Sequence, residues 1–129
     1  MVKSYTDVPQ SKMLAEILPI ESADMEYMFL KKDGSKVSNV PFVKELDEEP
    51  DCCYNFVPCW SLAALRACLP LGISIDGILY VFESHKTFDN EWVYEYKFED
   101  ISAPLYSKSS NEIDAAVDMI IQLKESKMI

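Results

Sequence analysis

Residues 58–71 form the longest apolar stretch of the chain, reading P-C-W-S-L-A-A-L-R-A-C-L-P-L with Ser61 and Arg66 as the clearly polar positions. A proline such as Pro58 is tolerated in the first turn of a helix, and Pro70 disfavours helical geometry at the residue before it. The pattern therefore predicts a helix of about three turns between the two prolines. Because it is apolar nearly all the way round, we expect this helix to be buried and central.

Two further helices are predicted near the ends of the chain. Asp7 precedes Pro9 and stands three residues before Gln10, which is the spacing of a capping box, and Pro19 stops a helix that reaches about Leu18. Near the C-terminus, Ser109 stands three residues before Glu112, and apolar residues recur at helical spacing from position 113 to 123. We expect that helix to end at about Ser126.

Apolar and polar residues alternate with a period of two in other parts of the chain. This alternation predicts strands at residues 25–31 and 92–98. A turn at residues 33–34 makes residues 36–43 a possible return strand, and residues 78–82 are rich in β-forming side chains, between turns at residues 76–77 and 84–91. Residues 73–75 lead into the strand that starts at position 78. The last two strands form a hairpin, and Trp92, Tyr94, Tyr96 and Phe98 share one face of it. Residues 101–107 fit either an edge strand or a connector.

These elements predict one α+β domain over residues 1–129. In this interpretation, antiparallel hairpins pack against the central helix, and the N- and C-terminal helices complete its cover. Residues 44–51, K-E-L-D-E-E-P-D, are the most charged segment and are expected to form a solvated connector.

Charge narrows the classes of partner. With 12 basic and 22 acidic residues the formal charge is −10, which opposes direct binding to nucleic acid because phosphates are bound largely by lysine and arginine. No apolar run approaches the roughly 18 residues of a membrane span, and residues 1–7 do not resemble a signal peptide. We therefore expect a cytoplasmic protein that binds another protein, with a homo-oligomer left open.

No chemical motif emerges from the reactive residues. The cysteines, at positions 52, 53, 59 and 68, lack metal-ligand spacing and are expected to be unpaired thiols, since the compartment is reducing. His85, the single histidine, lies in the predicted hairpin loop, away from any thiol. Gly34, Gly72 and Gly77 cannot make a phosphate-binding loop. We predict no catalytic residues, metal or cofactor.

The candidate interaction residues are Trp60, Arg66, Trp92, Tyr94 and Tyr96. The three on the hairpin either pack in the core or form a recognition surface, since tyrosine and tryptophan are common at interface hot spots. Arg66 either extends its stem along apolar surface toward a carboxylate or anchors an anion near Trp60.

Segments in the same order along the chain are similar to uncharacterised small proteins of phages, prophages and mobile elements in gut Bacteroidetes. They are Gln10-Ser11-Lys12 with Leu14, Ser22-Ala23-Asp24-Met25 with Tyr27, Pro58-Cys59-Trp60-Ser61-Leu62 with Leu65 and Leu69-Pro70, Trp92 with Tyr94 or Tyr96, and Asp114-Ala115-Ala116 with Met119 and Leu123. Arg66 departs from the pattern, which has an aliphatic or acidic residue there. The resemblance implies a genomic setting and no activity.

The hypothesis from the sequence is thus a non-enzymatic accessory or protein-interaction protein of a mobile element or prophage. Two alternatives remain open. One is an acidic nucleic-acid mimic that inhibits a host DNA-binding protein, which needs carboxylates gathered on one face. The other is a small ligand-binding or enzymatic domain with a site near the central helix.

Overall fold

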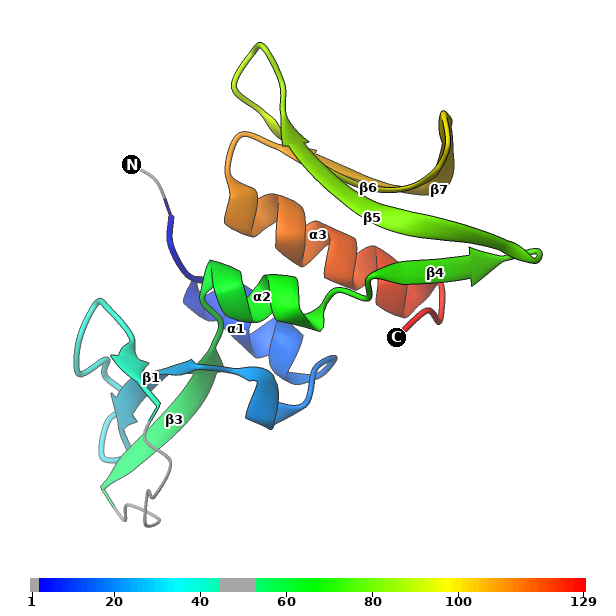
Figure 1. Ribbon diagram of the computed structural model, residues 1–129. Helices are drawn as coiled ribbons and strands as arrows, with labels where there is room; N and C mark the ends of the chain where they lie inside the picture. Colours follow the sequence, from blue (N-terminus) through cyan, green and yellow to red (C-terminus); the bar gives the residue numbers. More distant parts are fainter. Residues whose placement is uncertain (1–2, 45–52) are drawn as a thin grey trace.

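The computed structural model describes residues 3–44 and 53–129 and shows an α+β fold (Figure 1). Within these residues there are two antiparallel sheets and three α-helices, which confirms the predicted fold class. Most of the acidic run, residues 45–51, and Cys52 lie outside the described residues, so the prediction of a connector there stays a prediction.

The first half of the chain forms α1 (Val8–Ala15), a 3₁₀ turn (Ile20–Ser22) and a three-stranded sheet. Its strands are β1 (Met25–Leu30), β2 (Phe42–Val43) and β3 (Tyr54–Cys59), in the order β2-β1-β3. The strand predicted at residues 25–31 is confirmed. Its predicted return partner is shorter than expected, with a single bridge at Lys36 and two paired residues in β2. Pro41 immediately precedes this edge strand, where its missing N–H is tolerated.

Helix α1 begins as its sequence predicts. The Asp7 carboxylate accepts a hydrogen bond from the Gln10 backbone N–H, and the Gln10 side-chain oxygen accepts one from the Asp7 N–H. This is the reciprocal capping box. The helix ends at Ala15 rather than Leu18, but Leu14 and Leu18 are both buried in the core.

The helix predicted between the two prolines is shorter and more exposed than expected. α2 spans Leu62–Cys68, and Ser61 caps it by accepting a hydrogen bond from the Ala64 N–H. Pro58 instead lies in β3, because pairing with β1 keeps the chain extended through Cys59. Pro70 does end the helix, leaving Leu69 in an extended conformation. The arrangement of hairpins around a central α2 is therefore not confirmed.

The second sheet has four strands, β4 (Gly72–Ile75), β5 (Ile78–Lys86), β6 (Trp92–Phe98) and β7 (Ile101–Ser109), in sequential order. The hairpin of β5 and β6 is confirmed, but β5 continues to Lys86, so His85 lies in a strand and not in the loop. Residues 101–109 form an edge strand rather than a connector. Asp76 and Gly77 both have positive φ, as a tight two-residue hairpin turn requires.

Helix α3 (Glu112–Glu125) contributes more buried residues than α2, which buries Ala64 and Leu65. It is capped by Asn111 rather than Ser109, and it buries seven residues: Ile113, Ala115, Ala116, Val117, Met119, Ile120 and Leu123. It packs against β6, β7 and α2. Figure 1 shows all three helices on the same side of the four-stranded sheet. Among the described residues, no helix covers the other side of that sheet.

Candidate functional site

Arg66 joins four elements of the fold. Its Nη1 donates to Glu112 Oε2 at 2.8 Å and to Tyr94 Oη at 3.0 Å, and both terminal nitrogens lie 3.3 Å from Ser84 Oγ. The Tyr94 hydroxyl in turn donates to Glu112 Oε2 at 2.6 Å. The guanidinium also lies 5.8 Å from the centre of the Phe82 ring and 5.5 Å from that of Tyr94. Arg66 thus connects α2 to β5, β6 and α3.

The electrostatics of this cluster favour fixed protonation states. Burial alone would lower the pKa of the Arg66 guanidinium, but the hydrogen bonds to Tyr94 and Glu112 outweigh it and hold that pKa above its ordinary value. Burial and the hydrogen bond to Glu112 raise the pKa of Tyr94 far above its ordinary value. A charged arginine paired with a carboxylate and a neutral tyrosine suit structural cross-linking better than acid–base chemistry or capture of an anion.

The other aromatic candidates lie mostly in the core. Trp60 is fully buried, and its Nε1 donates to Ser22 Oγ at 2.9 Å, so its polar contact lies outside the Arg66 cluster. Tyr96 is also fully buried, and its hydroxyl donates to the Pro70 carbonyl at 2.8 Å. Burial raises the pKa of Tyr96. Trp92 is half-buried against the core, with Lys86 Nζ 5.7 Å from its ring centre. The buried area of Trp60 and Tyr96 stabilises the fold.

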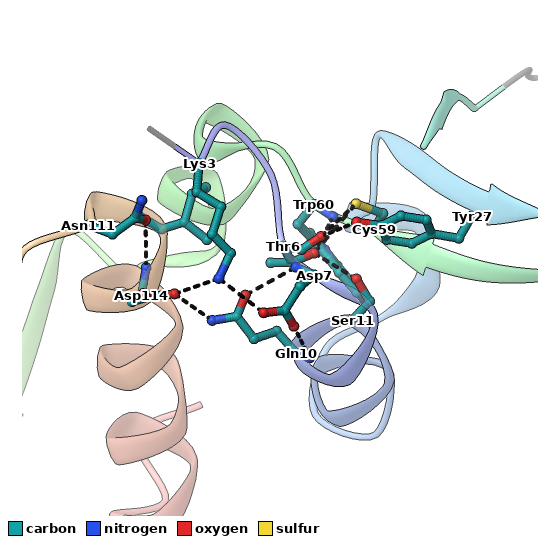
Figure 2. Close-up of polar contacts among 11 residues, drawn as sticks. Lys3, Thr6, Asp7, Gln10, Ser11, Tyr27, Cys59, Trp60, Asn111 and Asp114 are labelled. Atoms are coloured by element: carbon teal, nitrogen blue, oxygen red, sulfur yellow. Dashed lines mark hydrogen bonds and ion pairs between the residues drawn. The ribbon is translucent and has the colours of Figure 1, made fainter. Parts of the chain in front are cut away.

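A second polar cluster, which the sequence does not predict, fixes the N-terminal segment (Figure 2). Thr6 Oγ1 lies 2.8 Å from Ser11 Oγ and 3.5 Å from Cys59 Sγ, and it accepts from the Trp60 N–H at 3.2 Å. The Tyr27 hydroxyl donates to the Thr6 carbonyl at 2.7 Å. Burial raises the pKa of the Cys59 thiol. The hydrogen bond from Thr6 would lower that pKa, but the effect of burial is larger. A buried, protonated thiol is a poor nucleophile and a poor metal ligand.

The same segment is tied to α3 by charge. Lys3 Nζ lies 3.1 Å from Asp7 Oδ2 and 2.8 Å from Asp114 Oδ1, and Gln10 Nε2 donates to Asp114 Oδ1 at 2.7 Å (Figure 2). Burial alone would raise the pKa of Asp114, but the hydrogen bonds from Lys3 and Gln10 hold it below its usual range. No sequence spacing reveals this contact, because Lys3 and Asp114 are 111 positions apart.

The helix-free side of the four-stranded sheet carries exposed apolar residues. Because side chains alternate along a strand, the residues between those that face the core lie on this side. We call it the outer sheet face, made by Leu79, Val81, Glu83, His85, Val93, Glu95, Lys97, Tyr106 and Lys108. Leu79, Val81 and Tyr106 are 60%, 51% and 48% exposed.

Strand β6 nevertheless has buried side chains on this face. Val93 is 2% exposed and Glu95 is 6% exposed, although Val93 lies outside the main core cluster. Val93 is directly opposite His85 and Lys108, and Glu95 is directly opposite Glu83 and Tyr106. Side chains from β5 and β7 therefore flank a recessed strip along β6. In Figure 1 the β5–β6 loop and the β6–β7 turn both bend away from α3, which makes this face concave.

A hollow of about 320 Å³ lies at the end of the same hairpin. It is lined by His85, Lys86, Thr87 and Phe88. Phe88 is fully exposed at the turn, and His85 connects the hollow to the outer sheet face. This hollow is distant from Trp60, so it does not correspond to the ligand site considered near the central helix.

The described residues hold neither a metal-binding cluster nor a membrane-spanning helix. Among residues 3–44 and 53–129, no three histidine, cysteine, aspartate or glutamate side chains lie close enough together to hold a metal ion. Across those two ranges, none of the helices combines the length and apolar character that crossing a membrane would require.

Comparisons with protein-family models, with curated proteins and with solved structures gave no match for this chain.

Proposed function

We propose that the protein is a non-enzymatic interaction protein of the cytoplasm that binds a partner protein through its outer sheet face. The observation that carries this proposal is the exposure of Leu79 and Val81 on β5, with Tyr106 across the recessed β6 strip, on a sheet face that no helix of the described residues covers. Grouped apolar side chains that remain exposed on a folded domain mark sites where another molecule binds.

The strand register explains why these side chains stay exposed. Leu79 is paired with Ser74 and Val81 with Gly72, so β4 offers them no large apolar neighbour on this face. A Cβ atom at Gly72 would lie 3.0 Å from Leu79 Cδ1, so the Leu79 side chain leans over the glycine backbone. The two aliphatic side chains form one surface at the β4–β5 end of the sheet.

Charge indicates what kind of protein would bind here. The chain carries a formal charge of −10, and a partner with net positive charge would be attracted to it over a distance of about a Debye length. A second copy of the chain is a poorer occupant, since two copies of the same acidic protein repel each other. A monomeric mass at micromolar concentration is expected in light scattering, and a stable dimer that is broken by Val81→Ser would contradict a heterologous partner.

The paired state of the reactive groups supports a role without catalysis. The Arg66, Tyr94 and Glu112 side chains hydrogen-bond to one another, and Cys59 is enclosed beneath Thr6. The resemblance to proteins of phages and mobile elements supports an accessory role in such an element. The nucleic-acid mimic receives less support, because Lys3, Arg66 and Lys108 are interspersed among the acids and pair with them.

The test is capture from native cells with surface variants. Leu79→Ser combined with Val81→Ser removes the apolar surface, and Val43→Ser, at another exposed strand position, is the matched control. We expect the double variant to lose a protein that wild type and Val43→Ser both retain, with all three giving the same thermal melt. Equal recovery by the double variant would refute binding through the outer sheet face.

A further inference from the structure

Two carboxylates face each other on the outer sheet face. Glu83 in β5 and Glu95 in β6 are directly opposite across the strand pair, so their side chains lie on the same face. Glu83 is exposed, whereas Glu95 is 6% exposed in the recessed strip. Like charges at directly opposite positions destabilise a sheet, and burial of one of them strengthens the effect because screening by water is weaker there.

The surrounding charges relieve this repulsion in part. Lys97 Nζ lies 3.6 Å from Glu95 Oε1, which is an ion pair but longer than a hydrogen bond. Lys97 itself is paired across the sheet with Val81, two residues along the strands from the two glutamates and on the same face. Lys108 on β7 lies 4.0 Å from Glu91, and His85 is the remaining titratable side chain of β5 on this face. The Glu83–Glu95 pair thus places two carboxyl groups beside an apolar surface.

The neighbouring residues suit one kind of side chain. Tyr106 is directly opposite Glu95 on β7 and exposes about half of its surface. An aromatic ring next to paired carboxylates fits a guanidinium, which stacks on rings and donates two parallel hydrogen bonds to a carboxylate. Leu79 and Val81 continue the surface for the apolar residues that flank such a side chain.

We propose that the partner inserts an arginine side chain between Glu83 and Glu95, against Tyr106, and places apolar residues on Leu79 and Val81. This inference rests on the proposed function and specifies the partner's chemistry: a segment in which arginine is flanked by apolar residues. The arginine takes the place at Glu95 that Lys97 holds in the unbound protein.

The test uses peptides of known sequence. A display library of random 12-residue peptides is selected on the wild-type protein, and the tightest peptide is synthesised with arginine and with citrulline, its neutral isostere. On wild type we expect citrulline to weaken binding by about tenfold, since a partly buried charge pair is lost. On Glu83→Gln combined with Glu95→Gln the two peptides should bind within about twofold of each other.

Two further variants serve as controls for this comparison of peptides and proteins. Lys97→Gln removes the competing cation and should tighten the arginine peptide several-fold. Glu125→Gln, an exposed acid on α3 with the same change in charge, should leave the preference for arginine unchanged. Thermal melts of all variants show whether each is folded.

The outcomes separate this inference from the proposed function. If selected peptides lose binding with Leu79→Ser and Val81→Ser, yet carry no basic residue or prefer arginine equally on the double glutamine variant, the arginine proposal is wrong and the interaction surface stands. If they bind all variants alike, both proposals are wrong.

Discussion

Replacing one buried leucine of α3 tests whether that helix, rather than α2 alone, is the centre of the core. Leu123→Ala removes three carbon atoms from a fully buried site in contact with the main cluster. The lost transfer free energy is about 2.4 kcal/mol at roughly 0.8 kcal/mol per methylene, and the cavity left behind raises the cost to about 3–5 kcal/mol. For a chain of this size we expect the melting temperature to fall by roughly 11–18 °C.

Two other leucines give matched comparisons for the same substitution. Leu65 of α2 is fully buried too, so Leu65→Ala should cost about 2–5 kcal/mol. Leu71, just after Pro70, is 87% exposed, and Leu71→Ala should change stability by less than about 0.5 kcal/mol. Urea unfolding followed by tryptophan fluorescence measures all three. If Leu123→Ala were as harmless as Leu71→Ala, α3 would not be the buried helix described here.

Three other perturbations test the polar clusters. Tyr94→Phe removes the hydroxyl that lies between Arg66 and Glu112, and urea unfolding should show a loss of about 1–3 kcal/mol; an unchanged midpoint would contradict the cross-link. Thr6→Val should cost about 1–3 kcal/mol by the same measurement, because it leaves a buried backbone N–H unpaired, whereas Thr6→Ser should recover most of that stability. The pKa of Asp114 is depressed in the folded state, so its contribution is present above the unfolded value of 3.8 and is lost as the pH falls through the folded value. Between pH 5 and pH 2, the melting temperature of wild type should therefore fall further than that of Asp114→Asn. Parallel plots of melting temperature against pH for the two proteins would refute this.

The sequence predicts correctly those elements that depend on residues close together in the chain. The capping box of Asp7 and Gln10, the turn at Asp76-Gly77 and the alternation of residues 92–98 all depend on neighbours within a few positions, and all three are present in the structure. The apolar period of residues 113–123 likewise predicted α3, with its start displaced from Ser109 to the Asn111 cap.

Signals that depend on distant partners misled the prediction around Pro58. An apolar run bounded by prolines is compatible with a helix along its whole length. Pairing of β3 with β1 held residues 54–59 extended, and Ser61 was left to cap a two-turn helix. A sequence gives no direct measure of that competition, because the partner strand lies some 30 positions earlier.

The sequence predicts some residues of the candidate sites but not the contacts between them. The sequence singles out Arg66 and Tyr94 separately, but their direct hydrogen bond and their shared contact with Glu112 depend on how three elements pack. Leu79 and Val81 were counted as ordinary strand residues, since alternation shows which residues share a face and not whether another element covers it. The opposition of Glu83 and Glu95 follows from the hairpin register, which the exact length of the β5–β6 loop sets.

The most direct test of the central claim follows the methyl groups of leucine and valine by NMR while the captured partner, or the selected arginine peptide, is added. If the partner binds the outer sheet face, the methyl signals of Leu79 and Val81 shift first and most, while those of the exposed residues Val43 and Leu71 stay unchanged. Shifts confined to Val43 or Leu71, with Leu79 and Val81 unmoved at saturation, would show that the partner binds elsewhere.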